Sequence, residues 1–414
     1  MFSLILQGLQ RIKLNLSSLP VITLSLFASA LSFIKFDHCF RTNWSSPDVY
    51  THACYSDISA LFGARDLISG AWPYVSSTNS VEYPPITGFV MWATSLITPK
   101  SHDAYRYYFL INIAFIALLF MGTSIFVAKI NPKKWHLLPL APAVIGSLYI
   151  NWDMWAVITA LASIYWFDRK KYQWSAIALG IAIATKFFPV VLLAPIAIIF
   201  FRRRDPLTGF KYLLTSLEIW ALINIPFALT TPSGWWRFFK LNSERGADFG
   251  SLWYSLQLLG LKISSHGTIN FATIALFLIL TIWVSGVLLK SPEIPTLASI
   301  SIIFVTIFTI ASKVYSPQYI LWLVPLGVIA MRREKDRAAF WVWQGIELLY
   351  HVAVWQYLAA VSGTRFGLPA TWYAVAGLIR VAGSAFFAYK ILLSTRQRDP
   401  HSEEFLESPQ ASYA

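Results

Sequence analysis

Residues 107–128 read YYFLINIAFIALLFMGTSIFVA, an apolar run without a single charged side chain. As a helix, a run of this length can cross a lipid hydrocarbon core of about 30 Å. Similar runs recur along the 414 residues, of which 56% are hydrophobic and 13% are charged. Soluble proteins average roughly 45–50% apolar and about 25% charged residues. The sequence therefore predicts an all-α, polytopic membrane protein.

About a dozen membrane spans are expected, and they form one integral-membrane domain over residues 1–393. The expected spans are 17–36, 83–98, 107–128, 137–150, 152–167, 175–201, 209–229, 269–289, 297–311, 318–331, 338–360 and 372–393. Two large loops are expected on the outer face, at 37–82 and 230–267. The segment 394–414 is rich in Ser, Glu and Pro and is predicted to be a disordered tail.

The net charge of +13 comes largely from short basic clusters between the spans. These clusters are Arg11 with Lys13, 202–204, 332–337, and Arg396 with Arg398. Cytoplasmic loops retain Lys and Arg in this way, so the pattern indicates a plasma-membrane protein with both termini inside and no nucleic-acid partner. The clusters 133–134 and 169–171 would then lie outside if every span were crossed once. Either a short segment within 137–167 is re-entrant, or 175–201 is two half-spans broken at 186–189.

The first outer loop contains DVYTHACYSDISALFGARDLISGAWPYVSSTNSVEYPP at 48–85. Its apolar residues from Ile58 to Ile68 recur at helical spacing, which predicts an amphipathic helix lying in the membrane interface. Asp57 follows Ser56 at the start of this helix, where an acid can cap the helix or do chemistry. Cys39 and Cys54 lie on the same outer side and could form a disulfide or remain free thiols.

Several segments together resemble the GT-C fold of membrane glycosyltransferases. They are CYSDISALFGARDLISGAWPY (54–74), VEYPPITGFVMW (81–92), INWDMWAV (150–157), GIAIATKFFPVVLL (180–193), LNSERGADFGSLW (241–253) and SKVYSPQYILWLVPL (312–326). The set is most similar to glycosyltransferase family 87, the polyprenyl-phosphate-mannose-dependent α-1,2-mannosyltransferases of actinobacteria that elongate phosphatidylinositol mannosides. The resemblance implies that a carboxylate in the first outer loop is catalytic, and Asp57 matches it by position. It supports glycosyl transfer more strongly than it supports mannose.

The expected reaction moves a hexose from a polyprenyl-phosphate sugar to a hydroxyl of a glycolipid or envelope glycan, with inversion. Asp57 would take the proton from that hydroxyl. Lys or Arg can stabilise the leaving phosphate by charge and hydrogen bonds, so neither a cofactor nor a divalent metal is required. The expected donor-site residues are Lys186, Lys313, Arg245, Glu82, Tyr83, Tyr315 and Gln318, and those of the acceptor loop are Glu244, Asp248, Trp235 and Trp236.

Several candidates also have an ordinary structural interpretation. Lys186 could snorkel from a helix end, Lys313 could be a solvated loop residue, and 244–248 could be a charged turn. Asn151 and Asp153 stand at a helix break, where polar side chains satisfy freed backbone groups.

Glu347, His351 and Arg380 lie within the last two spans, and we expect Arg380 to pair with Glu347 as part of the structure. The competing functions are a lipid or sugar transporter, or flippase, and an inactive relative. Transporters often show matched, interrupted halves, and no such repeat is apparent in this sequence.

Overall fold

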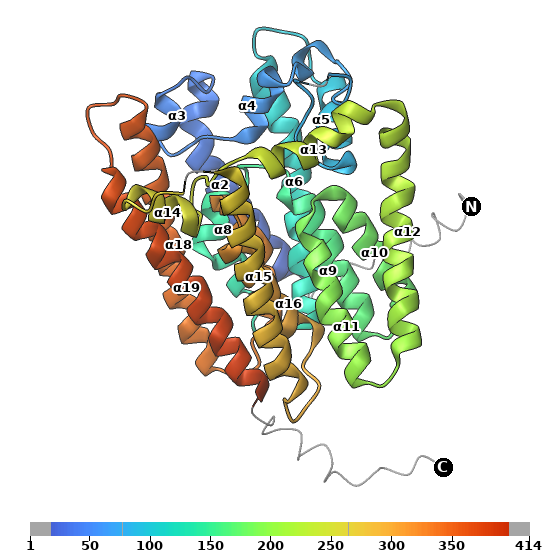
Figure 1. The fold of residues 1–414 in the computed structure, drawn as a ribbon. Helices are drawn as coiled ribbons and strands as arrows, with labels where there is room; N and C mark the ends of the chain where they lie inside the picture. The colour runs from blue at the N-terminus through green and yellow to red at the C-terminus, as the bar shows by residue number, and fades with distance from the viewer. Residues whose placement is uncertain (1–17, 77, 264, 397–414) are drawn as a thin grey trace.

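The computed structural model is a helical bundle (Figure 1). It describes residues 18–76, 78–263 and 265–396, and within these ranges it contains no strand. The all-α class expected from the sequence is therefore confirmed. The last helix continues to Arg396, so the tail expected at 394–414 could begin only after that residue, outside the described ranges. Arg11, Lys13 and Arg398 also lie outside them.

Within the described residues, five helices are long and apolar enough to cross a membrane. They are α2 (Leu19–Thr42), α6 (Ala104–Ile130), α12 (Pro206–Thr230), α15 (His266–Leu289) and α19 (Ala370–Arg396). Helices α12 and α15 face outward with large apolar side chains, such as Leu229 at 77% and Phe271 at 75% exposure. Contiguous apolar surface of this kind is rare on soluble monomers and fits a lipid environment. A sixth long helix, α18 (Lys335–Val361), packs along α19.

The centre of the bundle holds two shorter helices, α16 (Leu297–Ala311) and α17 (Ile320–Ala330). Every residue of α17 is buried, and so is every residue of α16 except Phe308. Helices that are apolar on all sides belong in an interior, which is where these two lie. The 3₁₀ turn η4 (Pro317–Tyr319) joins them near the upper end of the bundle.

Of the expected spans, one is a single short helix and two are divided. The segment 83–98 forms α5 (Pro85–Leu96), whose 12 residues reach only about 18 Å. The segment 137–150 is divided into α7 (Leu137–Leu140) and α8 (Pro142–Ser147), ahead of α9 (Asp153–Asp168). The segment 175–201 is divided into α10 (Tyr172–Thr185), η3 (Phe188–Leu192) and α11 (Leu193–Arg202). Proline explains the break between α7 and α8, at Pro142, and the break before η3, which contains Pro189, because proline lacks the N–H that would continue a preceding helix.

The broken segments remove the conflict over the basic clusters. Lys134 donates to the carbonyl of Arg333 at 2.8 Å, and Arg203 donates to the hydroxyl of Tyr172 at 2.8 Å. Arg202 donates to the carbonyl of Glu293 at 2.6 Å, in the turn between α15 and α16. The clusters 133–134, 169–171, 202–204 and 332–337 therefore gather at one end of the bundle, which we call the basic end. Helices break within 137–167 and again at Lys186, at the positions of both alternatives left open by the sequence.

The opposite end carries the two large loops (Figure 1). The first contains α3 (Asp48–Thr51), α4 (Asp57–Ala64) and η2 (Leu67–Ser69), and the second contains α13 (Pro232–Glu244) and α14 (Leu252–Leu258). A disulfide joins Cys39 to Cys54 in the first loop. The amphipathic helix expected here is α4, which is shorter than expected. Its apolar face packs on α6, where Phe62 stacks on Tyr108 at 4.1 Å between ring centroids, and it is therefore covered by protein.

Candidate active site

A cavity of about 650 Å³ lies beneath the two loops. It is lined by the start of α4, the end of the first loop, the chain breaks at 150–151 and 186–188, the α13 segment, residues 312–322 and α18. The sequence candidates that line it are Asp57, Glu82, Tyr83, Lys186, Arg245, Asp248, Lys313 and Gln318. Residues separated by more than 200 positions in the chain thus meet around one space.

Asp57 is the first residue of α4, but it does not cap the helix. That role belongs to Ser56, whose hydroxyl accepts a hydrogen bond from the Ile58 N–H and donates to the carbonyl of Tyr149 at 2.8 Å. Asp57 is therefore not the cap, although it lies in the first turn, where an acid complements the helix dipole, and its carboxylate lines the cavity. It accepts hydrogen bonds from the Tyr55 hydroxyl at 2.9 Å and from Asn151 Nδ2 at 2.7 Å.

The surroundings of Asp57 shift its protonation equilibrium. Burial raises the pKa of Asp57 above its ordinary value, although hydrogen bonds from Asn151 and Tyr55 and the charge of Lys186 act in the opposite direction. The charge of Asp57, together with burial, holds the pKa of Tyr55 well above its ordinary value. Tyr55 thus remains a hydrogen-bond donor at neutral pH. A carboxylate with a raised pKa is a better proton acceptor than an ordinary aspartate.

Lys186 is placed by the break between α10 and η3, where its backbone is extended. Its side chain is 9% exposed and donates to Asp153 Oδ1 at 2.8 Å and to Asn151 Oδ1 at 3.3 Å. The indole N–H of Trp322 also donates to Asp153 Oδ1, at 2.6 Å. A lysine ammonium has three N–H donors, and the described residues accept two of them by hydrogen bonds, so one is left for an anion in the cavity.

Glu82 and Tyr83 complete the wall next to Asp57. Both oxygens of Glu82 accept from the guanidinium of Arg65, at 2.7 and 2.9 Å. The hydroxyl of Tyr83 accepts from Asn151 Nδ2 at 2.7 Å, so one amide group bridges Tyr83 and Asp57. Asn151 is therefore the residue that aligns this wall.

The far wall carries the charged residues of the second loop. Arg245 forms an ion pair with Asp248. Lys313 donates to the carbonyls of Asn242 at 2.7 Å and of Arg245 at 2.8 Å, which joins the end of α13 to the loop after α16. Burial and the charge of Arg245 lower the pKa of Lys313. Backbone carbonyls already hold the ammonium of Lys313. The better-placed cations for a phosphate are therefore Arg245 and Lys186.

Four sequence candidates lie outside the lining of this cavity. Glu244 is exposed and 4.0 Å from Lys240, and Trp236 is 55% exposed. Trp235 donates to Asn224 Oδ1 at 2.9 Å. Tyr315 is fully buried beside Glu347 and Arg380. The expected pair of Arg380 and Glu347 is present at 2.9 Å, which confirms its structural interpretation.

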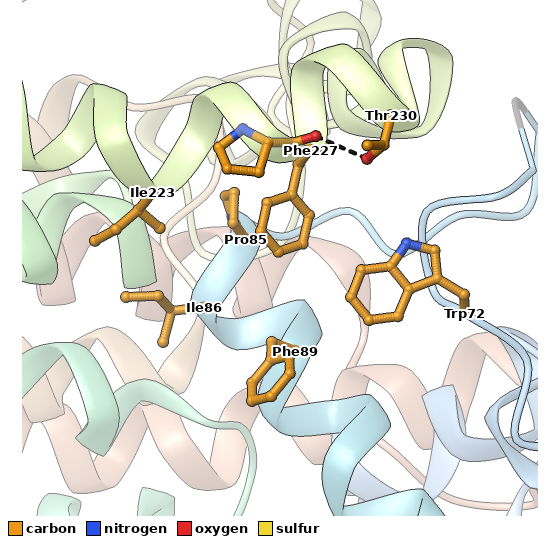
Figure 2. Close-up of a pocket in the computed structure, with 8 residues that line it drawn as sticks. Trp72, Pro85, Ile86, Phe89, Ile223, Phe227 and Thr230 are labelled. Atoms are coloured by element: carbon orange, nitrogen blue, oxygen red, sulfur yellow. Dashed lines mark hydrogen bonds between the residues drawn. The ribbon is translucent and has the colours of Figure 1, made fainter.

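An apolar groove of about 460 Å³ lies nearby, between α5 and α12 with Trp72 at its edge (Figure 2). Its walls include Ile86 and Phe89 of α5 and Ile223 and Phe227 of α12. A small void of about 10 Å³ lies between the groove and the cavity. It shares Pro85 with the groove and shares Tyr83, Pro84, Phe187, Phe238 and Phe239 with the cavity. The polar cavity therefore adjoins a surface suited to a hydrocarbon chain.

Comparison with known proteins gives no family assignment. No family model matches the sequence, and no curated protein matches it. Among solved structures, the chain is similar to ArnT from Cupriavidus metallidurans bound to undecaprenyl phosphate. The alignment has 15% identity and a TM-score of 0.46, and it covers 90% of this chain and 77% of that one. A likeness this distant carries no argument about the fold or activity of this chain.

Proposed function

We propose that this protein is a membrane glycosyltransferase that takes a hexose, mannose first among the candidates, from a polyprenyl-phosphate sugar. The acceptor is a hydroxyl of a glycolipid or envelope glycan. One observation carries the proposal: a carboxylate and an ammonium face the same cavity, and an apolar groove adjoins it. A lipid-linked sugar phosphate needs a polar site for its head and an apolar surface for its chain, and both are present within a short distance.

In the proposed reaction the acceptor oxygen attacks the anomeric carbon as the bond from that carbon to the phosphate oxygen breaks. The acceptor proton passes to Asp57, and the electron pair of the broken bond leaves with the polyprenyl phosphate. Inversion follows from attack opposite to the leaving group. Tyr55 and Asn151 orient the carboxylate of Asp57 through their hydrogen bonds. The free N–H of Lys186 stabilises the phosphate as its charge grows.

The prenyl chain is assigned to the apolar groove between α5 and α12. That groove opens beside lipid-facing residues such as Leu222, which is 67% exposed. The basic end is assigned to the cytoplasmic side of the membrane, because membrane proteins retain Lys and Arg on that side. The cavity lies at the opposite end and would therefore work outside the cytoplasm, where nucleotide sugars are absent. Both termini are accordingly assigned to the cytoplasm, and no cofactor is assigned to the reaction.

The direct test uses purified protein in detergent with polyprenyl-phosphate mannose and an acceptor lipid extract. We expect glycosylated lipid and free polyprenyl phosphate in equal amounts, with the anomeric configuration inverted. A flippase would yield neither product in micelles, because it makes and breaks no bond. Parallel reactions with other polyprenyl-phosphate hexoses test the sugar, and transfer of a different hexose alone would refute mannose while retaining the reaction class.

A further inference from the structure

Two histidines and an aspartate meet in the first loop, apart from the cavity. His38 Nε2 lies 2.7 Å from Asp48 Oδ2, and His52 Nδ1 lies 2.9 Å from Asp48 Oδ1. The two imidazole rings stack with centroids 3.5 Å apart and an interplanar angle of 13°. One potential ligand atom from each residue falls within 4.8 Å of the other two. The sequence spacing did not reveal this group, because His38 belongs to α2, whereas Asp48 begins α3 and His52 follows its end.

The backbone around the three side chains is held in place. The disulfide involves Cys39, directly after His38, and Cys54, two residues after His52. The hydroxyl of Thr42 donates to Asp48 Oδ2 at 3.1 Å, a contact of the kind that orients a metal-binding carboxylate. The hydroxyl of Thr51 lies 3.1 Å from His52 Nδ1, and the carbonyl of Asp48 lies 3.3 Å from the same atom. These two contacts would yield to an ion on that nitrogen.

Two imidazole nitrogens and one carboxylate oxygen form a ligand set that suits zinc. Zinc binds such atoms at about 2.0–2.2 Å in a tetrahedron, which places the ligands roughly 3.4 Å from one another. One ligand atom from each residue lies within 4.8 Å of the other two, and rotation of the imidazole side chains brings them to that spacing around an ion. The side chains of His38, Asp48 and His52 are 39%, 29% and 46% exposed, so an ion can enter from solvent and water can be the fourth ligand.

We propose that His38, Asp48 and His52 bind one Zn²⁺ ion, which joins the end of α2 to α3. The consequence reaches the cavity through Tyr50, which belongs to α3 and lines the cavity wall. Tyr50 stacks on Tyr55 at 5.8 Å between centroids, and Tyr55 donates to Asp57. The ion thus acts as a positioning element for the wall that holds Asp57. Metal binding is measured without a transfer assay, so this proposal is tested independently of the proposed function.

The test is calorimetric titration of Zn²⁺ into full-length protein that carries no polyhistidine tag and has been stripped with chelator under non-reducing conditions. We expect one Zn²⁺ per chain and a higher melting temperature, with no response to millimolar Mg²⁺, which prefers oxygen ligands. His52→Ala should weaken binding at least tenfold. His102→Ala is the matched control, because His102 is an exposed histidine outside this cluster, and it should bind zinc like the wild type.

Either of two results with Zn²⁺ would overturn the proposal: wild-type protein that binds no Zn²⁺, or His52→Ala protein that binds it as tightly as the wild type. Co²⁺ gives a second readout on the wild type that needs no variant to fold. Its visible absorption should have the intensity of a tetrahedral site with nitrogen and oxygen ligands. The weak absorption typical of octahedral, hydrated Co²⁺ would also overturn the proposal.

Discussion

Replacing Asp57 with Asn should remove nearly all transfer activity and leave the protein folded. The change removes the proton acceptor and retains the shape of the side chain. Loss of a general base slows reactions by about 10²–10⁴-fold, which corresponds to about 3–5 kcal/mol of activation free energy. The new amide keeps its hydrogen bonds if its oxygen faces Asn151 Nδ2 and its NH₂ faces the Tyr55 oxygen, because a hydroxyl can also accept.

The effect of Asp57→Asn on stability has a definite sign. A carboxyl group whose pKa is raised in the folded state binds its proton more tightly there than in the unfolded chain. Its ionisation therefore destabilises the fold as the pH rises through the raised pKa. At neutral pH, removal of this charge should leave the melting temperature unchanged or higher. A residue that served only the fold would give the opposite result, a lower melting temperature.

The assay compares transfer rates and melting temperatures of wild type, Asp57→Asn and Asp66→Asn. Asp66 is an exposed acid of the same loop with a φ of 54°, a conformation that Asn also tolerates. Asp66→Asn should match the wild type in both measurements. Full activity in Asp57→Asn would refute the assignment of the base. A large fall in melting temperature together with the activity would refute the claim that Asp57 acts in chemistry rather than in folding.

Three further predictions follow from the same geometry. The wild-type rate should fall in acid with a midpoint above the ordinary aspartate pKa of about 3.9, since burial raises the pKa of Asp57, and a midpoint at or below that value would contradict the environment described. Lys186→Met alone should destabilise the protein by about 3–5 kcal/mol, because it leaves the buried carboxylate of Asp153 unpaired. When Asp153→Asn is added, stability should recover while the KM for the donor rises at least tenfold. An unchanged KM in the double variant would show that Lys186 does not bind the donor. Ile223→Trp should fill the apolar groove and slow transfer from long-chain donors more than from short-chain donors. Leu222→Trp is the control, because Leu222 faces lipid, and it should slow neither. Equal effects of Ile223→Trp on both donors would exclude the groove as the site of the prenyl chain.

The sequence predicts those parts of this structure that depend on local pattern. Apolar runs without charge predict helices in lipid, and the helical class follows from them. A lysine three residues before a proline within an apolar run predicts the break at Lys186, because neither residue suits the middle of a span. The number of crossings was harder to predict, since the apolar segment that becomes α5 has the composition of a span and the length of half of one.

Other parts of the site depend on which face of a helix meets the cavity. Helix α13 carries aromatic residues on several sides, and the sequence singled out Trp235 and Trp236, whereas Phe238 and Phe239 line the cavity. Helical periodicity finds an apolar face only where another face is polar, so it could not choose among four aromatic residues. The role of Asn151 was also undervalued, because its partners Asp57 and Lys186 lie 94 and 35 positions away.

The polar site and the broken helices have a common physical cause. Each break frees backbone groups that lipid cannot satisfy, so protein must supply their partners. The Asp57 N–H donates to the carbonyl of Ile150 at 2.8 Å, and the Ser56 hydroxyl donates to that of Tyr149. The hydroxyl of Thr87 donates to the carbonyl of Thr185, at the end of the helix before Lys186. The first loop thus supplies hydrogen-bond partners for the backbone at the break after 137–150, and α5 supplies one for the break at Lys186. These contacts bring the side chains at the two breaks together around one cavity.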